Sequence, residues 1–252
     1  MGEIMHRFFV KEENITDKFI RVNGKDVNHI KNVLRMEQGD QLELIGEKFN
    51  YICVINEVLK EEILLSIITT NDKKNESPVI INLYQGLPKS TKMETIVQKC
   101  TEIGVTNFFP VATYRSVVKI TDYKKETKKI ERWQAIAEEA AKQSRRDIIP
   151  TVNSILSFKE MILNLKGKTV IVPYEDEDDL SIGGLKATFS DTREINIVIG
   201  PEGGFEDSEI ENLKDIGSYI VSLGPRILRT ETAGIVTATI LLYEFGDIGV
   251  IK

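Results

Sequence analysis

The chain has 252 residues, of which 41% are hydrophobic and 29% are charged, a balance that supports a packed core and excludes an extensively disordered protein. The net charge of −6 argues against a uniformly basic nucleic-acid-binding protein, yet residues 73–150 carry 15 basic and 9 acidic side chains, a local excess of +6. This basic middle can present a positive face to phosphate or can simply be a solvated helix surface, and charge alone favours neither reading.

Several other classes of protein are disfavoured by the residues that are missing. The two cysteines, Cys53 and Cys100, form no spaced cluster, so we expect buried small hydrophobes in a reducing cytoplasm, with no disulfide framework and no metal site. Residues 1–10 include His6 and Arg7, which predicts no secretory signal. No apolar run approaches membrane-spanning length, so we expect no membrane association.

The first 72 residues predict a small β-barrel with one helix. Short β-branched runs occur at residues 42–45, 51–55 and 63–68, separated by turn residues, which is typical of strands. Apolar residues spaced by three and four predict a short helix between Asp26 and Met36. Residues 71–78 are polar, lack periodicity and end in proline, so they predict a boundary between domains at 1–72 and 73–252.

After residue 73 the pattern changes to strands that alternate with helices. We expect strands at 79–84, 107–112, 169–172, 195–199 and 219–223, and helices at 93–103, 127–145, 206–216 and 233–245. This alternation predicts an α/β domain with a parallel sheet that helices cover on both faces. The acidic residues 175–179 are interpreted as an exposed loop.

The turn after residue 199 is the first candidate for chemistry. A buried strand ends in Gly200 and Pro201, and Glu202, Gly203 and Gly204 follow, before a helix whose start is signalled by Ser208 and Glu211. Ligands of open α/β sheets bind at the carboxyl ends of strands, and glycines let the backbone approach them closely. The turn is thus a ligand site or a plain strand-to-helix connection. Its spacing matches neither a P-loop nor the dinucleotide fingerprint.

A second turn, at residues 223–233, sharpens this reading. Arg226 and Arg229 fall between a strand and a helix that begins near Thr230, with Thr230 or Thr232 as the expected N-cap. A cation at a helix N-terminus opposes the macrodipole, so it calls for an anionic partner. Glu231 can be that partner locally, and a phosphate or carboxylate ligand can be it functionally.

These segments together resemble the RsmE family of ribosomal RNA methyltransferases, within the SPOUT superfamily. The resemblance is carried by six motifs in the family's order: His6-Arg-Phe-Phe-Val10, His29-Ile-Lys-Asn-Val-Leu-Arg-Met36, Lys99-Cys-Thr-Glu-Ile-Gly-Val105, Arg132 to Arg145, Gly200-Pro-Glu-Gly-Gly-Phe205 and Leu223-Gly-Pro-Arg-Ile-Leu-Arg-Thr-Glu-Thr-Ala233. They span nearly the whole chain, and their combination is highly specific.

The resemblance implies a fold, a reaction and a set of partners. It implies a PUA-like RNA-binding barrel at 1–72 and, at 73–252, a SPOUT-type α/β domain with a deep trefoil knot, a topology that is rare. It also implies a homodimer that uses S-adenosylmethionine to methylate N3 of one uridine of 16S rRNA in the assembled 30S subunit. Three loops would hold the cofactor, and the residues expected there are Val172, Pro173, Gly200, Pro201, Glu202, Gly203, Leu223, Gly224, Ile227, Leu228 and Thr232.

The same resemblance suggests roles for charged residues. Arg229 and Arg226 are the catalytic candidates because a cation near the uracil carbonyls favours the anionic base. Arg7 can join them from the barrel, and Glu202 or Glu231 can orient these arginines. RNA contacts are expected from His6, Arg7, His29, Lys31, Arg35, Arg115, Lys119, Arg145 and Arg146.

Some alternatives stay open at this stage. The two histidines can instead be ordinary surface or packing residues. The chain can be a non-catalytic RNA-binding or ribosome-assembly protein that keeps the fold, although the intact segments at 200–205 and 223–233 argue against this. It can also be a knotted methyltransferase for another RNA nucleotide, such as a tRNA ribose.

Overall fold

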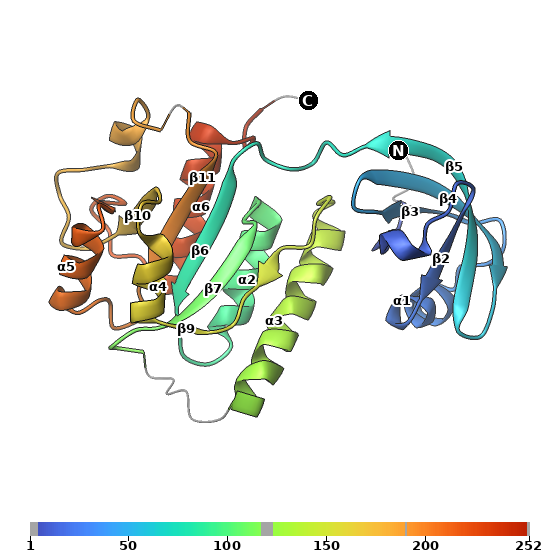
Figure 1. Cartoon of the computed structure of the whole chain (residues 1–252), viewed down its shortest axis with the longest axis horizontal. Helices are drawn as coiled ribbons and strands as arrows, with labels where there is room; N and C mark the ends of the chain where they lie inside the picture. Colours follow the sequence, from blue (N-terminus) through green and yellow to red (C-terminus); the bar gives the residue numbers. More distant parts are fainter. Residues whose placement is uncertain (1–4, 117–122, 190, 251–252) are drawn as a thin grey trace. The chain divides into compact units, whose positions relative to one another are not determined.

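A computed structural model describes residues 5–116, 123–189 and 191–250 and divides the chain into two compact units (Figure 1). The first comprises Met1–Glu76 with Arg145–Ile148, and the second comprises Ser77–Ser144 with Ile149–Lys252. The division falls four residues beyond the boundary expected from sequence, and four residues from the middle of the chain join the N-terminal unit.

The first unit is built on a five-stranded sheet in the order β1-β3-β4-β5-β2, in which β1 and β3 are parallel and the other pairs antiparallel. Its alternating side chains bury Ile20, Leu42, Leu44 and Leu65 in one core, and Ile30 from the short helical segment joins them. The strands are β1 (Arg7–Phe9), β2 (Phe19–Asn23), β3 (Gln41–Ile45), β4 (Phe49–Val58) and β5 (Glu62–Asp72), with helical turns η1 (Glu12–Asn14), α1 (Lys25–Asn28) and η2 (His29–Val33).

A buried carboxylate ties the polar segment after β5 into this unit. The side chain of Asp147 is fully buried and pairs with the Arg7 guanidinium at 2.9 Å. It also accepts hydrogen bonds from the backbone amides of Lys74 and Asn75, both at 2.9 Å, and from the Asn50 side chain at 2.7 Å. Residues 73–76, which sequence predicts as a linker, are therefore fixed by hydrogen bonds to residues 145–148.

The second unit contains a parallel sheet in the order β12-β10-β11-β6-β7-β8, with β9 also paired to β7. Its strands are β6 (Ile80–Gly86), β7 (Asn107–Ala112), β8 (Thr151–Val152), β9 (Leu156–Ser157), β10 (Val170–Pro173), β11 (Glu194–Ile199) and β12 (Tyr219–Val221). Its helices are α2 (Lys92–Ile103), α3 (Tyr123–Gln143), α4 (Phe158–Leu165), η3 (Ile182–Leu185), α5 (Asp207–Asp215) and α6 (Thr230–Phe245).

Helices cover both faces of this sheet, and each face has its own hydrophobic core (Figure 1). Successive strand residues point to opposite faces. Ile197 of β11 accordingly packs in the core that contains residues of α2, α3 and α6, and Val198 packs in the core that contains residues of α4 and α5. The prediction of a parallel sheet buried on both sides is confirmed.

Two helices have N-caps that differ from those that the sequence predicts. Helix α5 is capped by a reciprocal pair, Glu206 and Glu209, instead of Ser208 and Glu211. Helix α6 begins at Thr230, as the turn at 223–233 predicts, but its N-cap is Arg229, whose side chain makes no capping bond, in place of Thr230 or Thr232. The strands β1, β2, β8 and β9 and helix α4 were not predicted, since short segments often carry too little periodic signal.

The hydrogen bonds and the ion pair of Asp147 yield a prediction about stability. Burial raises the pKa of Asp147, but hydrogen bonds from Asn75, Asn50, Lys74 and Arg7 outweigh it and hold the pKa below its ordinary value. Asp147→Ala leaves the buried Arg7 without this partner, and we expect it to destabilise the unit by about 3 kcal/mol. Hydrogen exchange of the β3 amides should accelerate about 100-fold.

The matched control is Asp17→Ala, because Asp17 is exposed in the same unit. The pH dependence follows from the sign of the shift: a lowered carboxyl pKa stabilises the fold above the unfolded value and ceases to do so as the pH falls through the folded pKa. The difference in the free energy of unfolding between the wild type and Asp147→Ala should therefore become smaller as the pH falls. Equal exchange rates for the two variants at pH 7 would contradict the assigned role.

Candidate functional site

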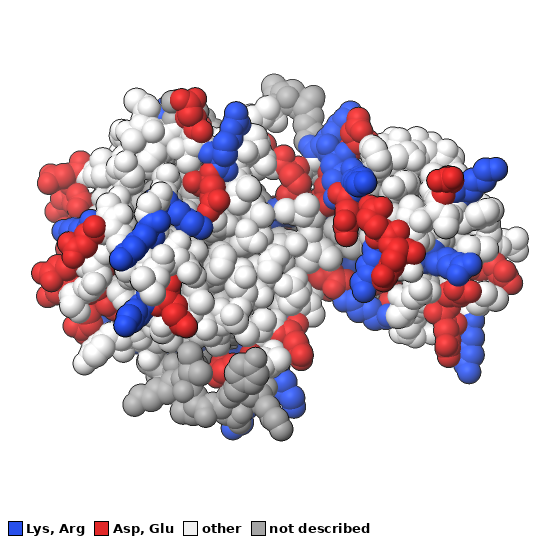
Figure 2. All heavy atoms as spheres, in the orientation of Figure 1, with Lys and Arg blue, Asp and Glu red and all other residues white. Residues whose placement is uncertain are grey.

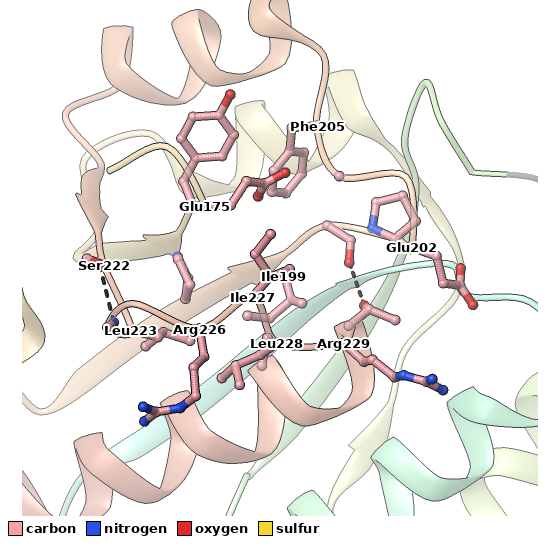
Figure 3. A pocket seen from close by; sticks show the side chains of 18 of the residues that line it. Glu175, Ile199, Glu202, Phe205, Ser222, Leu223, Arg226, Ile227, Leu228 and Arg229 are labelled. Carbon is pink, nitrogen blue, oxygen red and sulfur yellow. Dashed lines mark hydrogen bonds between the residues drawn. The ribbon is translucent and has the colours of Figure 1, made fainter. Parts of the chain in front are cut away.

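Three loops that follow neighbouring parallel strands enclose one cavity of the second unit (Figure 3). Strands β12, β10 and β11 lie side by side in the sheet, so their carboxyl ends meet at one edge, where α/β proteins bind ligands. The cavity measures about 500 Å³, within the usual range for a small-molecule site. Its wall is formed by residues 173–175, 199–202 and 222–230, together with Lys92, Asp178, Gly204, Phe205 and Ala233.

Glycines make the close approach of these loops possible. A Cβ atom at Gly86, the last residue of β6, would lie 2.7 Å from the backbone nitrogen of Pro201, so a larger residue would push the two segments apart. Gly204 has φ +67°, a left-handed conformation that favours glycine, and a Cβ there would lie 2.8 Å from a carboxylate oxygen of Glu175. These two glycines therefore let the loop after β11 approach the end of β6 and the loop after β10 closely.

A buried hydrogen-bond relay connects two of the loops at the start of α6. The Thr230 hydroxyl donates to the Gly200 carbonyl at 2.5 Å and accepts from the Gln85 side-chain amide at 2.8 Å. Gln85 is completely buried and also donates to the Gly86 carbonyl at 3.0 Å. Thr230 therefore does not cap the helix as predicted, because its hydroxyl is used between segments. Sequence analysis missed Gln85, which lies within an apolar strand and carries no local signal.

A lysine holds the two acidic residues of the site. Lys92 Nζ lies 3.1 Å from a carboxylate oxygen of Glu202 and 3.2 Å from one of Glu231. Burial raises the pKa of Glu202, but amide hydrogen bonds from its own backbone and from Lys89, with the contact to Lys92, leave that pKa below its ordinary value. The sequence suggested that Glu202 or Glu231 orients the arginines. In the structure, both carboxylates pair with Lys92 instead. Lys92 was missed because it begins an unremarkable amphipathic helix.

The two arginines of the site are exposed. In the described part of the chain, neither Arg226 nor Arg229 has a side-chain hydrogen bond or ion pair, and both line the cavity. Figure 3 shows them extending from the loop to opposite sides. Arg229 is the N-cap residue of α6, so its charge lies near the positive end of the helix dipole. An anionic group bound nearby would relieve that repulsion.

The structure brings together most of the predicted cofactor residues. Eight of the eleven line the cavity: Pro173, Gly200, Pro201, Glu202, Leu223, Gly224, Ile227 and Leu228. The other three do not: Val172 is buried in a core, Gly203 faces Arg115, and Thr232 is exposed on α6. The acidic run, read from sequence as an exposed loop, supplies Glu175 and Asp178 to the wall.

The predicted RNA-binding residues fall into different environments. Arg7 and Arg146 do not fit that prediction, since their side chains are 4% exposed and pair with acidic residues of the first unit. Arg115 is exposed but binds Glu206 and the Gly203 carbonyl. His6, Lys31, Arg35 and Arg145 are exposed, and His29 packs edge-on against Phe8. Lys119 lies outside the described residues.

The surface view adds the distribution of charge. Figure 2 shows acidic and basic side chains interspersed over the visible face of the first unit. Among the described residues, no group of three His, Cys, Asp or Glu side chains is placed to hold a metal ion. Nor does any helix in the described ranges have the length and apolarity needed to cross a membrane.

Comparison with known proteins identifies relatives over nearly the entire chain. Residues 75–242 match a family described as an RNA methyltransferase domain, and residues 22–68 match one described as an RNA methyltransferase PUA domain. Ribosomal RNA small subunit methyltransferase E of Bacillus subtilis is 36% identical over 95% of this chain and 97% of its own length. The protein of that name from Aquifex aeolicus is 32% identical over 94% of this chain and 99% of its own.

Solved structures agree with these sequence matches. Ribosomal RNA small subunit methyltransferase E from Neisseria gonorrhoeae, bound to S-adenosylmethionine, superposes with a TM-score of 0.86 at 28% identity, covering 97% of this chain and 99% of that one. A Legionella pneumophila protein, solved with bound S-adenosylmethionine, has a TM-score of 0.87 at 31% identity, with the same coverage.

The relay at Thr230 yields a prediction that requires no ligand. Thr230→Val keeps the side-chain shape but leaves the Gly200 carbonyl and the Gln85 amide with one partner fewer, so we expect a loss of about 2 kcal/mol in the free energy of unfolding. Urea denaturation followed by the fluorescence of Trp133 measures it. Thr239→Val on the same helix, whose hydroxyl donates to the carbonyl of Ile235 one turn earlier, should cost less than half as much. Equal losses would argue against a special role for Thr230.

Proposed function

Because the chain belongs to the RNA methyltransferase family whose curated members are named ribosomal RNA small subunit methyltransferase E, we propose that it transfers a methyl group from S-adenosylmethionine to N3 of one uridine of 16S rRNA. The resemblance noted in the sequence is confirmed by this membership. The observation that carries the proposal is the convergence of three loops from adjacent parallel strands on one cavity, at whose edge Arg229 has no side-chain partner among the described residues.

The residues of the cavity suit such a cofactor. Apolar side chains of Ile199, Phe205 and Leu228 offer a surface for an adenine ring, and the surrounding backbone offers hydrogen-bonding groups. Glu175 and Asp178 contribute negative charge to a site whose ligand carries positive charge on sulfur and on its amino group. When bound, S-adenosylmethionine supplies an electrophilic methyl group on that sulfur. Two relatives of the same fold hold this cofactor.

The chain's own contribution to the reaction is electrostatic. N3 of uridine carries a proton and must lose it before it can accept a methyl group. A guanidinium beside the uracil carbonyls stabilises the anionic base in which the charge spreads onto oxygen. Arg229 is exposed, lines the cavity and has no partner among the described residues, so its guanidinium is available for this role. Arg226 is the second candidate for the same reasons.

The finer features implied by the family belong to this proposal. We propose that the C-terminal part of the second unit is a trefoil knot, a reading supported by the sheet order, in which β10 lies between β12 and β11. We also propose a homodimer and a location in the cytoplasm, where the ribosome is assembled. The matches at 22–68 and 75–242 support the division into an RNA-binding and a methyltransferase domain.

We further propose that the first unit contacts the RNA. The match to an RNA methyltransferase PUA domain supports this role. Its exposed residues His6, Lys31 and Arg35 are available to bind phosphate or bases. A base that is to be modified must be presented unstacked, which favours structured RNA in the assembled 30S subunit as the substrate over a free nucleoside.

One experiment tests the function directly. Small ribosomal subunits from a strain that lacks the modification are incubated with the protein and labelled S-adenosylmethionine, and the methylated nucleotide is mapped by mass spectrometry. We expect a single 3-methyluridine in 16S rRNA. Methylation of a ribose or of tRNA would redirect the proposal to another nucleotide, and the absence of any transfer would favour a non-catalytic RNA-binding protein.

A second prediction concerns Arg229. Arg229→Ala removes the cation proposed to stabilise the anionic base, so we expect kcat to fall by about 10³-fold while the dissociation constant for S-adenosylmethionine, measured by calorimetry, changes only a few-fold. The control is Arg193→Ala, because Arg193 is an exposed arginine of the same unit outside the cavity. Wild-type turnover by Arg229→Ala would exclude this catalytic role.

A further inference from the structure

A single lysine connects three segments around the cavity. Lys92 is the first residue of α2, Glu202 lies in the loop after β11, and Glu231 lies in the first turn of α6. The Nζ atom of Lys92 is 3.1 Å from Glu202 and 3.2 Å from Glu231. The hydrogen bond with Glu202 raises the pKa of Lys92, burial lowers it, and the bond with Glu231 raises it further, leaving it above its ordinary value. The lysine therefore stays charged at neutral pH.

The two carboxylates differ in how strongly they depend on Lys92. Glu202 also accepts hydrogen bonds from the backbone amide of Lys89, at 3.0 and 3.3 Å, so it remains anchored without the lysine. Among the described residues, Lys92 is the only group that pairs with the Glu231 side chain. Removing the lysine would therefore release chiefly Glu231.

In the sequence, the cation closest to Glu231 is Arg229. The two residues are separated by Thr230 alone, at the start of α6, and the Arg229 side chain has no partner among the described residues. Arginine and carboxylate groups form strong bidentate pairs. Such a pair would occupy the guanidinium that must face the acceptor base, and it would place a negative charge where the base itself becomes anionic.

We propose that Lys92 is a positioning residue that binds Glu231 and thereby keeps Arg229 available to the RNA base. This inference rests on the proposed role of Arg229 in the reaction. Lys92 contributes in this way without contacting the base, and the Lys89 amide keeps Glu202 anchored at the cavity wall.

The test is a loss of activity and its recovery by a second substitution. Lys92→Met removes the charge and keeps the length of the side chain. We expect kcat on 30S subunits to fall about 30-fold, with the dissociation constant for S-adenosylmethionine within threefold of wild type. In the double variant K92M/E231Q the released carboxylate is gone, so kcat should recover at least tenfold relative to K92M. Lys92→Arg, which keeps the cation, should retain activity within threefold.

Two comparisons separate this mechanism from a general structural role. K92M/E202Q should remain as impaired as K92M, because Glu202 is not the residue released. Circular dichroism checks that each variant is folded. If K92M proves unstable, the comparison is repeated with K92Q and the double variant K92Q/E231Q. Wild-type turnover by K92M, or no recovery in K92M/E231Q, would overturn the inference. Wild-type turnover by Arg229→Ala would contradict the proposed role of Arg229 itself, and this result does not depend on any variant of Lys92.

Discussion

The site depends on the hydrogen bond between the Thr230 hydroxyl and the Gly200 carbonyl. Gly200 lies in the loop after β11, and Thr230 is the first residue of α6. Gln85, buried at the end of β6, completes the relay by donating to the same hydroxyl. Buried polar groups are expensive to leave unpaired, so this arrangement admits few alternative positions for the start of α6. The position of α6 in turn determines where Arg229 and Glu231 emerge.

The charged residues around these hydrogen bonds form two groups. Lys92 pairs with both Glu202 and Glu231, and the arginines at the cavity are left without partners among the described residues. A simpler arrangement, in which each arginine pairs with an acidic residue, would remove the free cations on which the proposed reaction depends. Such unpaired cations beside a helix N-terminus are unfavourable in the resting protein, which is consistent with a site that is completed by its substrate.

Buried polar contacts also fix a segment of the first unit. There a buried carboxylate, Asp147, collects hydrogen bonds from residues far apart in the sequence and anchors the segment that follows β5. Arg7, which the family resemblance placed near the reaction, is engaged in this network. Arg7 belongs to the motif at residues 6–10, and its ion pairs with Glu43 and Asp147 give it a structural role there.

Local pattern was sufficient for much of this protein. Apolar runs and helical periodicity determined the parallel sheet of the second unit, and the turns at 200–205 and 223–233 marked two of the three loops, because turn chemistry and hydrophobic spacing are properties of short segments. The sequence also identified Arg226 and Arg229 as cations in need of a partner. Only the tertiary structure decided which partners the charged residues have. Gln85, Lys92 and Asp147 act on residues 70 or more positions away, and such pairings depend on how strands and helices come together, which no local pattern encodes.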